Sequence, residues 1–248
     1  MQNCEPLVRS FASGNVSRET FRKVMINVAK DWNENQKNLK VFLSSQDTFD
    51  KGKKLLLEMH GLLHDKKVYK STDKTFYDDL WENLKYETCR IVSAKETSIL
   101  WDIWHITRIE DIISNIVIGN KETIFGDEIQ AKLGIRIKDT GNAITRSEIE
   151  AFNNSINIKA LKEYRVKVGQ STKKIIEALE YKDIKRKVGK EQLEKILQNG
   201  GLTDDPKSIC LLDFWGRKNV LGLIMMPITR HQILHLNDCF RIKKSTHC

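Results

Sequence analysis

The sequence lacks the features that mark membrane-spanning and secreted proteins. No apolar run approaches the roughly 18 residues that a membrane-spanning helix needs, and the longest, "NVLGLIMMP", is much shorter. The first residues, "MQNCEPLVRSFASGNVS", contain no apolar stretch of the kind found in signal peptides. We therefore expect no membrane span and no signal peptide.

Cysteine is sparse and irregularly placed. The chain of 248 residues has five cysteines, an odd number, and none of them forms a C-x-x-C pair. This pattern disfavours a disulfide framework and is typical of free thiols in a reducing compartment. We therefore expect a cytoplasmic protein.

Strand patterns, internal repeats and low-complexity tracts are also missing, and the dominant hydrophobic period is helical. In the first predicted helix, for example, Val28 follows Met25 by three residues and Val24 by four, which is the spacing of one helix face. The predicted helices lie at 17–45, 49–65, 72–89, 98–119, 157–181, 189–201 and 205–243. Residues 120–142 are expected to form a long loop with at most one turn of helix. The sequence therefore predicts an all-α protein with one domain.

Several predicted helix ends carry capping signals. Thr75-x-x-Asp78 and Thr145-x-x-Glu148 match the capping box, in which a threonine and an acidic residue satisfy each other's backbone N–H groups. Ser17 is the expected N-cap of the first helix, and Gly119 is the expected end of the fourth. Pro227 predicts a break in the last helical segment.

Basic residues outnumber acidic ones, which raises the question of a nucleic-acid partner. The formal net charge is +9, from 42 Lys and Arg against 33 Asp and Glu. A nucleic-acid surface should concentrate that charge, yet most lysines are dispersed, and the densest run, residues 181–195, also contains acids. A solvated basic surface is the favoured interpretation, and nucleic-acid binding remains an alternative.

The last helical segment, "MMPITRHQILHLNDCFRI", contains a pair of histidines on its apolar side. At about 100° per residue, His231, His235 and Asp238 fall within an arc of roughly 60°. Asp238 could therefore orient an imidazole, act as a base, or pair with Arg108 from another helix.

A third histidine occupies a similar position on a second helix. His105 shares the apolar face of "WDIWHITRIED" with Trp101 and Ile109, and Arg108 lies on the flank of that face. Three imidazoles from two facing helices suit a borderline divalent ion and leave a coordination position open. The competing interpretation is that the three are hydrogen-bonded core residues, and spacing alone does not decide between the two.

The remaining charged and histidine positions have weaker patterns. His60 could face the same core, as a further ligand or a partner of one, whereas His64, at a helix end, should cap carbonyl groups or meet solvent. Glu110 and Asp111 project away from the face of His105 and are expected to be solvated.

Two motifs together resemble the DinB-like (YfiT/DinB) metalloenzyme superfamily. They are "ILWDIWHITRIEDIISNIVI" and "MPITRHQILHLNDCFRI", with W-H-x-x-R-x-E-D and R-H-x-x-x-H-L-N at their centres. The resemblance covers about residues 55–245. It implies a four-helix bundle with up-down-down-up order and a long crossover, to which residues 1–45 add an N-terminal helix.

The resemblance also implies a site and a chemistry. By position, the family's metal ligands correspond to His105, His231 and His235, and the ion is expected to be zinc or nickel. Relatives use it to activate a low-molecular-weight thiol, such as bacillithiol or mycothiol, or water, which implies a thiol S-transferase-like or hydrolase-like bacterial enzyme. Asp238 and Arg108 would serve as orienting or acid–base groups, and a homodimer is an expected assembly. A non-catalytic helical protein without metal is the main alternative.

Overall fold

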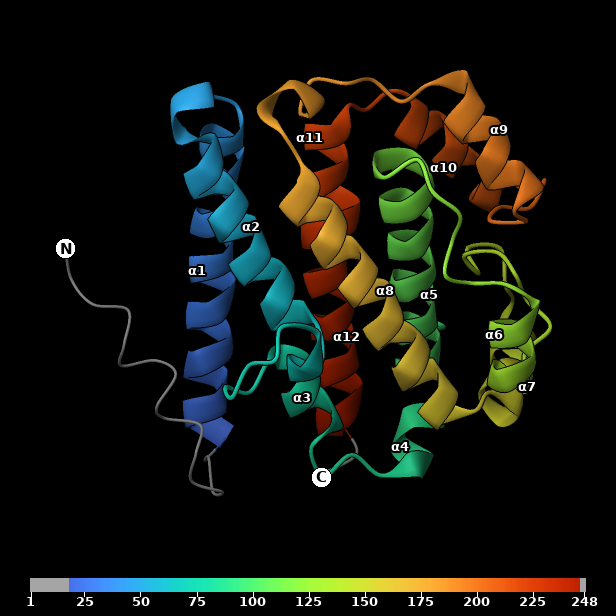
Figure 1. The fold of residues 1–248 in the computed structure, drawn as a ribbon. Coiled ribbons are helices and arrows are strands. Elements are labelled where there is room, and N and C mark those ends of the chain that lie inside the picture. Colours follow the sequence, from blue (N-terminus) through green and yellow to red (C-terminus); the bar gives the residue numbers. More distant parts are fainter. Residues whose placement is uncertain (1–17, 246–248) are drawn as a thin grey trace.

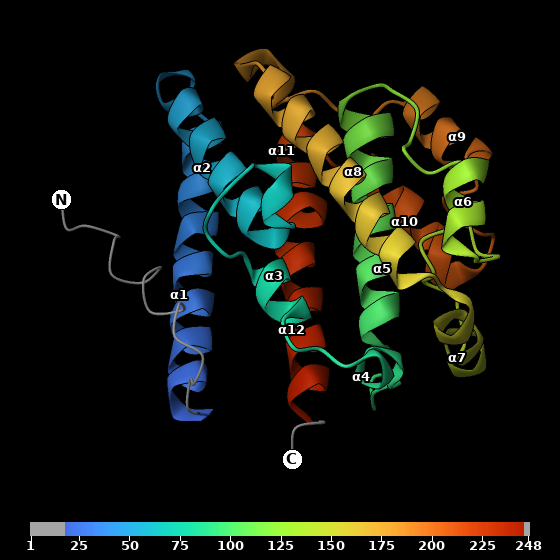
Figure 2. The ribbon, with the colours of Figure 1, turned by 60° about the horizontal axis from the view of Figure 1, so that its bottom comes forward.

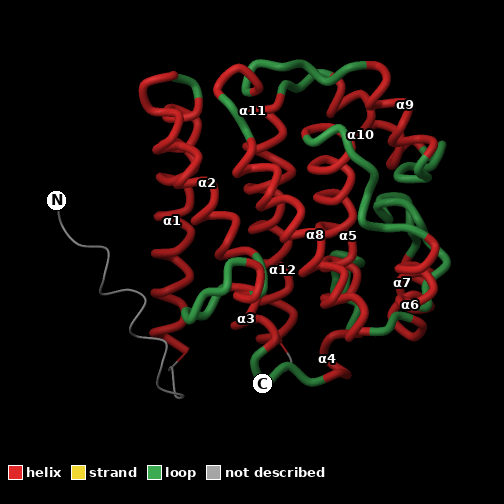
Figure 3. Tube along the Cα trace, viewed as in Figure 1, coloured by secondary structure: helices red, strands yellow, loops and turns green. Residues whose placement is uncertain are grey.

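The protein is all-α. We describe a computed structural model that covers residues 18–245, with side chains from Asp31 onward, and within these ranges no β-strand forms. The colouring by secondary structure shows helices joined by loops and turns (Figure 3). The long helices are α1 (Arg18–Leu43), α2 (Phe49–Leu63), α5 (Ile99–Asp111), α8 (Ile158–Ala178) and α12 (His231–Ser245).

Shorter helices complete the chain. They are α3 (Phe76–Trp81), α4 (Tyr86–Arg90), α6 (Asp127–Leu133), α7 (Arg146–Ser155), α9 (Lys190–Gln198), α10 (Pro206–Gly216) and α11 (Val220–Leu223). Figures 1 and 2 show α6, α7, α9 and α10 on the side of α5 that lies away from α1. The long predicted loop contains α6, which is longer than the single turn expected there. The region after residue 205, predicted as one or two helices, contains α10 and a second helical segment that runs from α11 into α12.

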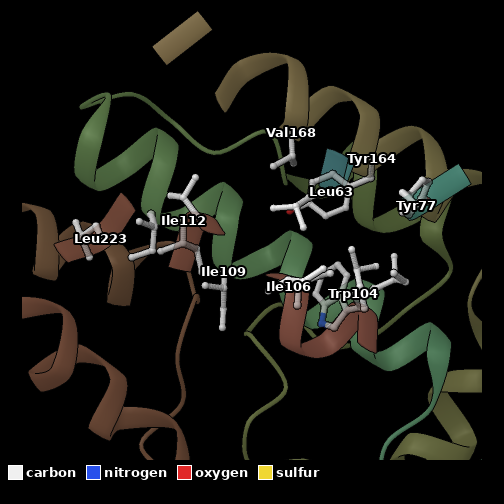
Figure 4. Packing of buried hydrophobic residues seen from close by; sticks show 14 of the residues in the cluster. Leu63, Tyr77, Trp104, Ile106, Ile109, Ile112, Tyr164, Val168 and Leu223 are labelled. Atoms are coloured by element: carbon white, nitrogen blue, oxygen red, sulfur yellow. The ribbon is translucent and has the colours of Figure 1, made fainter. Parts of the chain in front are cut away.

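Helix α5 lies at the centre of the fold. It packs against α12 and α8, and α7 also contacts it. Every residue of α5 is buried, and burial continues through a π-helical extension, η4 (Ile112–Ile118). Figure 4 shows Trp104, Ile106 and Ile109 of this helix, which belong to the same hydrophobic cluster as Leu63 of α2 and Tyr164 of α8. Because α5 is enclosed on all sides, its charged residues need partners inside the protein.

Two capping boxes confirm the helix starts expected from the sequence. In α3 the side chain of Thr75 accepts from the N–H of Asp78 while Asp78 accepts from the N–H of Thr75, and Thr145 and Glu148 do the same in α7. Gly119 caps the end of η4, as predicted. The predicted N-cap of the first helix, Ser17, lies outside the described residues.

Pro227 does not break the last helical segment, which corrects that expectation. The chain passes through it in a π-helix, η6 (Ile224–Arg230), that runs directly into α12. Wider π turns accommodate a residue that has no N–H, and side chains bond to carbonyl groups nearby. The Thr229 hydroxyl donates to the carbonyl of Ile224, and Gln36 of α1 donates to the carbonyl of Met225.

The N-terminal helix packs along the rest of the protein. Helix α1 lies beside α2 (Figures 1 and 2) and also contacts η6. Its side chains Trp32, Leu39 and Leu43 are buried in the common hydrophobic core.

Among the described residues, none of the helices combines the length and the apolar character that crossing a membrane would require.

Candidate metal centre

His105 is held in a fixed orientation at the centre of α5. Its Nδ1 lies 2.7 Å from the carbonyl oxygen of Thr140. A carbonyl can only accept, so Nδ1 carries the proton and donates it. The ring is also stacked on Trp101, with centroids 4.5 Å apart and an interplanar angle of 11°. The other ring nitrogen, Nε2, therefore presents a lone pair.

His235 of α12 is oriented in the same way by a carboxylate. Its Nδ1 lies 2.7 Å from Oδ1 of Asp102, whose side chain is fully buried on α5. A hydrogen bond from Nδ1–H to a carboxylate leaves the Nε2 lone pair free and makes it more basic, as in carboxylate–histidine–metal arrangements. Cys239 donates from its Sγ to the other oxygen of Asp102, at 3.7 Å.

His231 completes the group one turn earlier on α12. Its Nε2 lies 3.2 Å from Nε2 of His105, and its ring centroid is 4.5 Å from that of His235. Each of the three imidazoles offers one nitrogen, and these atoms all lie within 4.8 Å of one another. The structure thus brings together the three histidines that the sequence singled out.

Burial favours the neutral form of His105 and of His231. Burial lowers the pKa of His231 to about 3, and the neighbouring His235 adds to that shift. Burial also lowers the pKa of His105 well below its ordinary value, with His235 and His231 as further causes. Neutral imidazoles are the form that binds a metal.

The histidine group lies at the edge of the core. The side chain of Asp102 is fully buried, whereas 19 % of the His235 side chain is exposed, and His231 is also partly exposed. A catalytic metal site keeps one position open to solvent or substrate, whereas a structural site is closed. The partial exposure of His231 and His235 is compatible with such an open position.

Asp238 and Arg108 do not take the places expected from the sequence. Asp238 binds Lys95, at 2.9 Å, and Arg241, and its side chain is 22 % exposed. The carboxylate that orients His235 is Asp102 instead. Asp238 pairs with Lys95, which precedes α5, and with Arg241 on its own helix. A face analysis of one helix cannot detect a partner from another segment.

Arg108 is fully buried in a different set of contacts. It donates to the carbonyl of Lys138 at 2.7 Å and to Oδ1 of Asn199 at 2.6 Å, and its guanidinium lies 4.6 Å above the ring of Phe125. It does not pair with Asp238. These contacts tie α5 to two loops, and they give Arg108 a structural environment.

Glu110 and Asp111 are buried, which corrects the expectation that they are solvated. Asp111 accepts hydrogen bonds from the backbone N–H groups of Ile124 and Phe125 and from the hydroxyl of Tyr164. The expectation failed because residues 124–125 and α8 cover the side of α5 opposite His105.

Glu110 faces the two remaining histidines of the core. Its Oε1 lies 2.9 Å from Nε2 of His60, its Oε2 lies 3.0 Å from Nε2 of His64, and all three side chains are fully buried. His60 therefore joins a second group rather than the first. His64 does end α2, as expected, but its ring turns inward instead of meeting solvent.

A buried hydrogen-bond network connects the helices that carry both groups. Arg165 of α8 donates to the hydroxyl of Thr107, to the carbonyl of Leu63 and to the side chain of Gln232. Gln232 follows His231 and donates to the carbonyl of Ile106. The network holds α2, α5, α8 and α12 in register around the histidines.

Sequence reasoning missed Asp102 and Glu110 as functional candidates. For Asp102 a signal existed, because it precedes His105 by three residues and so lies on a neighbouring part of the same helix surface. For Glu110 no local signal existed. No protein-family model matches this chain, and no curated protein matches it.

Proposed function

We propose that this chain is a DinB-like metal-dependent enzyme in which His105, His231 and His235 bind one divalent ion, zinc or nickel. The observation that supports it most strongly is the orientation of two rings. Thr140 and Asp102 occupy Nδ1 of His105 and of His235, so the Nε2 lone pairs of both rings are available to an ion.

The alternative of purely structural core histidines fits this arrangement less well. Nε2 of His105 has no proton to donate, and it faces Nε2 of His231 at 3.2 Å. His231 could satisfy it only by donating from Nε2. Its own Nδ1 is buried and has no hydrogen-bond partner among the described residues. A shared ion would use the lone pairs of all three rings at once.

We further propose that α2, α5, α8 and α12 form the four-helix bundle of that superfamily. In support, α5 packs against α8 and α12, and α2 packs against α8 and α12. The segment between α5 and α8, which includes α6 and α7, would be the long crossover, and α1 would be the added helix.

An ion at this site would supply a Lewis acid that lowers the pKa of a thiol or of water at its open position. The residues of the chain have separate tasks. Asp102 fixes the tautomer of His235 and makes its Nε2 a stronger electron-pair donor to a metal. Thr140 fixes the tautomer of His105, and the ring of Trp101 covers one face of that imidazole. The partly exposed side of His231 and His235 is where a substrate would approach.

The decisive measurement is the metal content of tag-free protein purified without chelator or a nickel column. We expect His231→Ala to lose one equivalent of the divalent ion and to keep its helix content by circular dichroism. Arg230→Ala, an exposed neighbour on the same segment, should keep the full content. If His231→Ala retains all the metal of the wild type, the assignment is wrong.

A second experiment asks which nucleophile the site activates. Protein loaded with Co²⁺ is mixed with a low-molecular-weight thiol, and a thiolate-to-cobalt absorption band that is absent in His231→Ala supports thiol activation. Hydrolysis of an activated ester by wild type, without such a band and absent in His231→Ala, supports activation of water. If neither signal appears, the enzymatic part of the proposal fails while metal binding can stand.

A further inference from the structure

A second group of metal-ligand side chains lies inside the protein, separate from the three-histidine site. His60 and the helix-ending His64 come from the C-terminal end of α2, and Glu110 comes from α5. Their ligand atoms lie within 4.8 Å of one another. Two imidazoles and a carboxylate are a donor set that binds zinc in proteins.

The spacing of these atoms is compatible with shared coordination of one ion as well as with hydrogen bonds. The carboxylate of Glu110 turns one oxygen to each histidine, at 2.9 Å from His60 Nε2 and 3.0 Å from His64 Nε2. Two ligands of one tetrahedral zinc ion, at about 2.0–2.1 Å from it, lie roughly 3.3 Å apart. The observed separations therefore need only a small expansion to admit an ion.

Unpartnered polar atoms point to a missing group at the same place. Nε2 of His64 and Oε2 of Glu110 lie 3.0 Å apart, and apart from this contact neither atom has a hydrogen-bond partner among the described residues. Both side chains are fully buried. Leaving a buried imidazole nitrogen and a buried carboxylate oxygen unsatisfied costs free energy, and an ion between them would satisfy both.

The surroundings orient one ligand and make room for the other. The hydroxyl of Tyr69 lies 2.9 Å from Nδ1 of His60, which leaves Nε2 of His60 directed at Glu110. On α8, Gly169 lies against the ring of His64, and a β-carbon at that position would come within 2.6 Å of Nδ1. The ring can occupy this place only because residue 169 has no side chain.

We propose that His60, His64 and Glu110 form a second metal site, which binds zinc as a closed, buried centre with both oxygens of Glu110 available as ligands. The ion would join the C-terminal end of α2 to the C-terminal end of α5. All three ligand side chains are fully buried, unlike His235 of the first site, so exchange with solvent requires the protein to open. Arg165, a buried cation on α8, acts electrostatically on His64 and opposes positive charge at this site.

The number of zinc ions bound by wild type and two variants tests this inference independently of the proposed function. Each protein is unfolded with chelator, refolded with excess zinc, and desalted before plasma mass spectrometry. We expect two equivalents in wild type, one in His231→Ala and one in His64→Gln. Tyr69→Phe keeps all ligands and should still bind two.

The patterns of loss separate the two sites. One equivalent that disappears in His231→Ala and persists in His64→Gln overturns the second site and leaves the first. One equivalent that persists in His231→Ala and disappears in His64→Gln overturns the first site and leaves the second. If His64→Gln does not fold, His231→Ala decides, because retention of one equivalent supports the second site and complete loss overturns it.

The rate of zinc release gives a second readout. At room temperature with excess chelator, we expect wild type to lose one equivalent rapidly and to retain the other until the protein is unfolded. Rapid loss of both equivalents would contradict a closed centre. The retained equivalent should be present in His231→Ala and absent in His64→Gln.

Discussion

At the scale of single residues, the histidines of the first site depend on groups that orient them. Asp102 has no exposed surface, so its carboxylate is available only to partners in the core, His235 and Cys239. Burial raises the pKa of Asp102, and the hydrogen bond from His235 opposes that shift. The pair is stable because each residue satisfies the other.

We predict that Asp102→Asn weakens metal binding at the first site by about 10- to 100-fold. The amide can still accept a hydrogen bond from His235, but it removes the negative charge that makes the imidazole a strong donor. Isothermal titration of apo protein with zinc measures the change in dissociation constant.

Asp238→Asn is the matched control for that substitution. Asp238 binds Lys95 and Arg241 at the surface, and exposed ion pairs contribute only about 0–1 kcal/mol to stability. The zinc affinity of the Asp238→Asn variant should equal that of wild type. A loss in Asp238→Asn with no loss in Asp102→Asn would reverse the roles that the structure gives to the two carboxylates.

At the scale of helices, close packing between α2 and α8 fixes His64. Gly169 of α8 lies against this ring, and Gly61 of α2 lies against the ring of Tyr69. An added β-carbon would come within 2.6 Å of the His64 ring but only within 3.4 Å of the Tyr69 ring, which is an ordinary contact. The two glycines therefore differ in the reason for their presence.

We predict that Gly169→Ala lowers the free energy of unfolding by about 1–3 kcal/mol. Alanine is intrinsically better in a helix by up to about 1 kcal/mol, but its β-carbon would come within 2.6 Å of the fully buried ring of His64. Urea denaturation followed by circular dichroism measures the change.

Gly61→Ala, also within a helix, serves as the control for propensity alone. We expect it to leave stability unchanged or to raise it by a few tenths of a kcal/mol to about 1 kcal/mol. Equal effects of the two substitutions would show that the contact with His64 does not limit residue 169.

At the scale of the whole molecule, α1 is part of the common core. The sequence treats residues 1–45 as an extension, yet Leu39 and Leu43 of α1 are almost completely buried and Trp32 is 5 % exposed. Gln36 also donates to the carbonyl of Met225 and to the hydroxyl of Thr229, in the π-helical turn that leads to His231.

We predict that deletion of residues 1–44 destabilises the protein by about 5 kcal/mol or more. Three large apolar side chains would be lost from the core, each worth roughly 1.5–3 kcal/mol, and the π-helical turn before α12 would lose its bonds from Gln36. Thermal and urea unfolding of the shortened chain measure the loss.

Gln36→Leu separates the two contributions, because it removes only the hydrogen bonds to the π-helical turn. We expect a much smaller loss of stability than in the deletion, together with a measurable loss of zinc affinity at the first site. A deletion variant as stable as the full chain would show that α1 is a dispensable addition.

The sequence alone was sufficient for several features, and they share a physical basis. Helical periodicity, two capping boxes and the glycine stop at residue 119 are local signals, and the structure confirms them. The shared apolar faces of His105, His231 and His235 are also local. The sequence alone therefore singles out these three residues as a group.

Tertiary structure decided which other residues reach the core. Periodicity finds the more apolar side of a helix, but α5 is covered on every side, so Asp102 and Glu110, as well as His105, face buried partners. The partner of Asp102 is His235 on α12, 133 residues further along the chain. A partner of Glu110 is His60 on α2, 50 residues earlier. Whether a charged side chain meets water or a histidine depends on such distant neighbours, and no local pattern in the sequence records them.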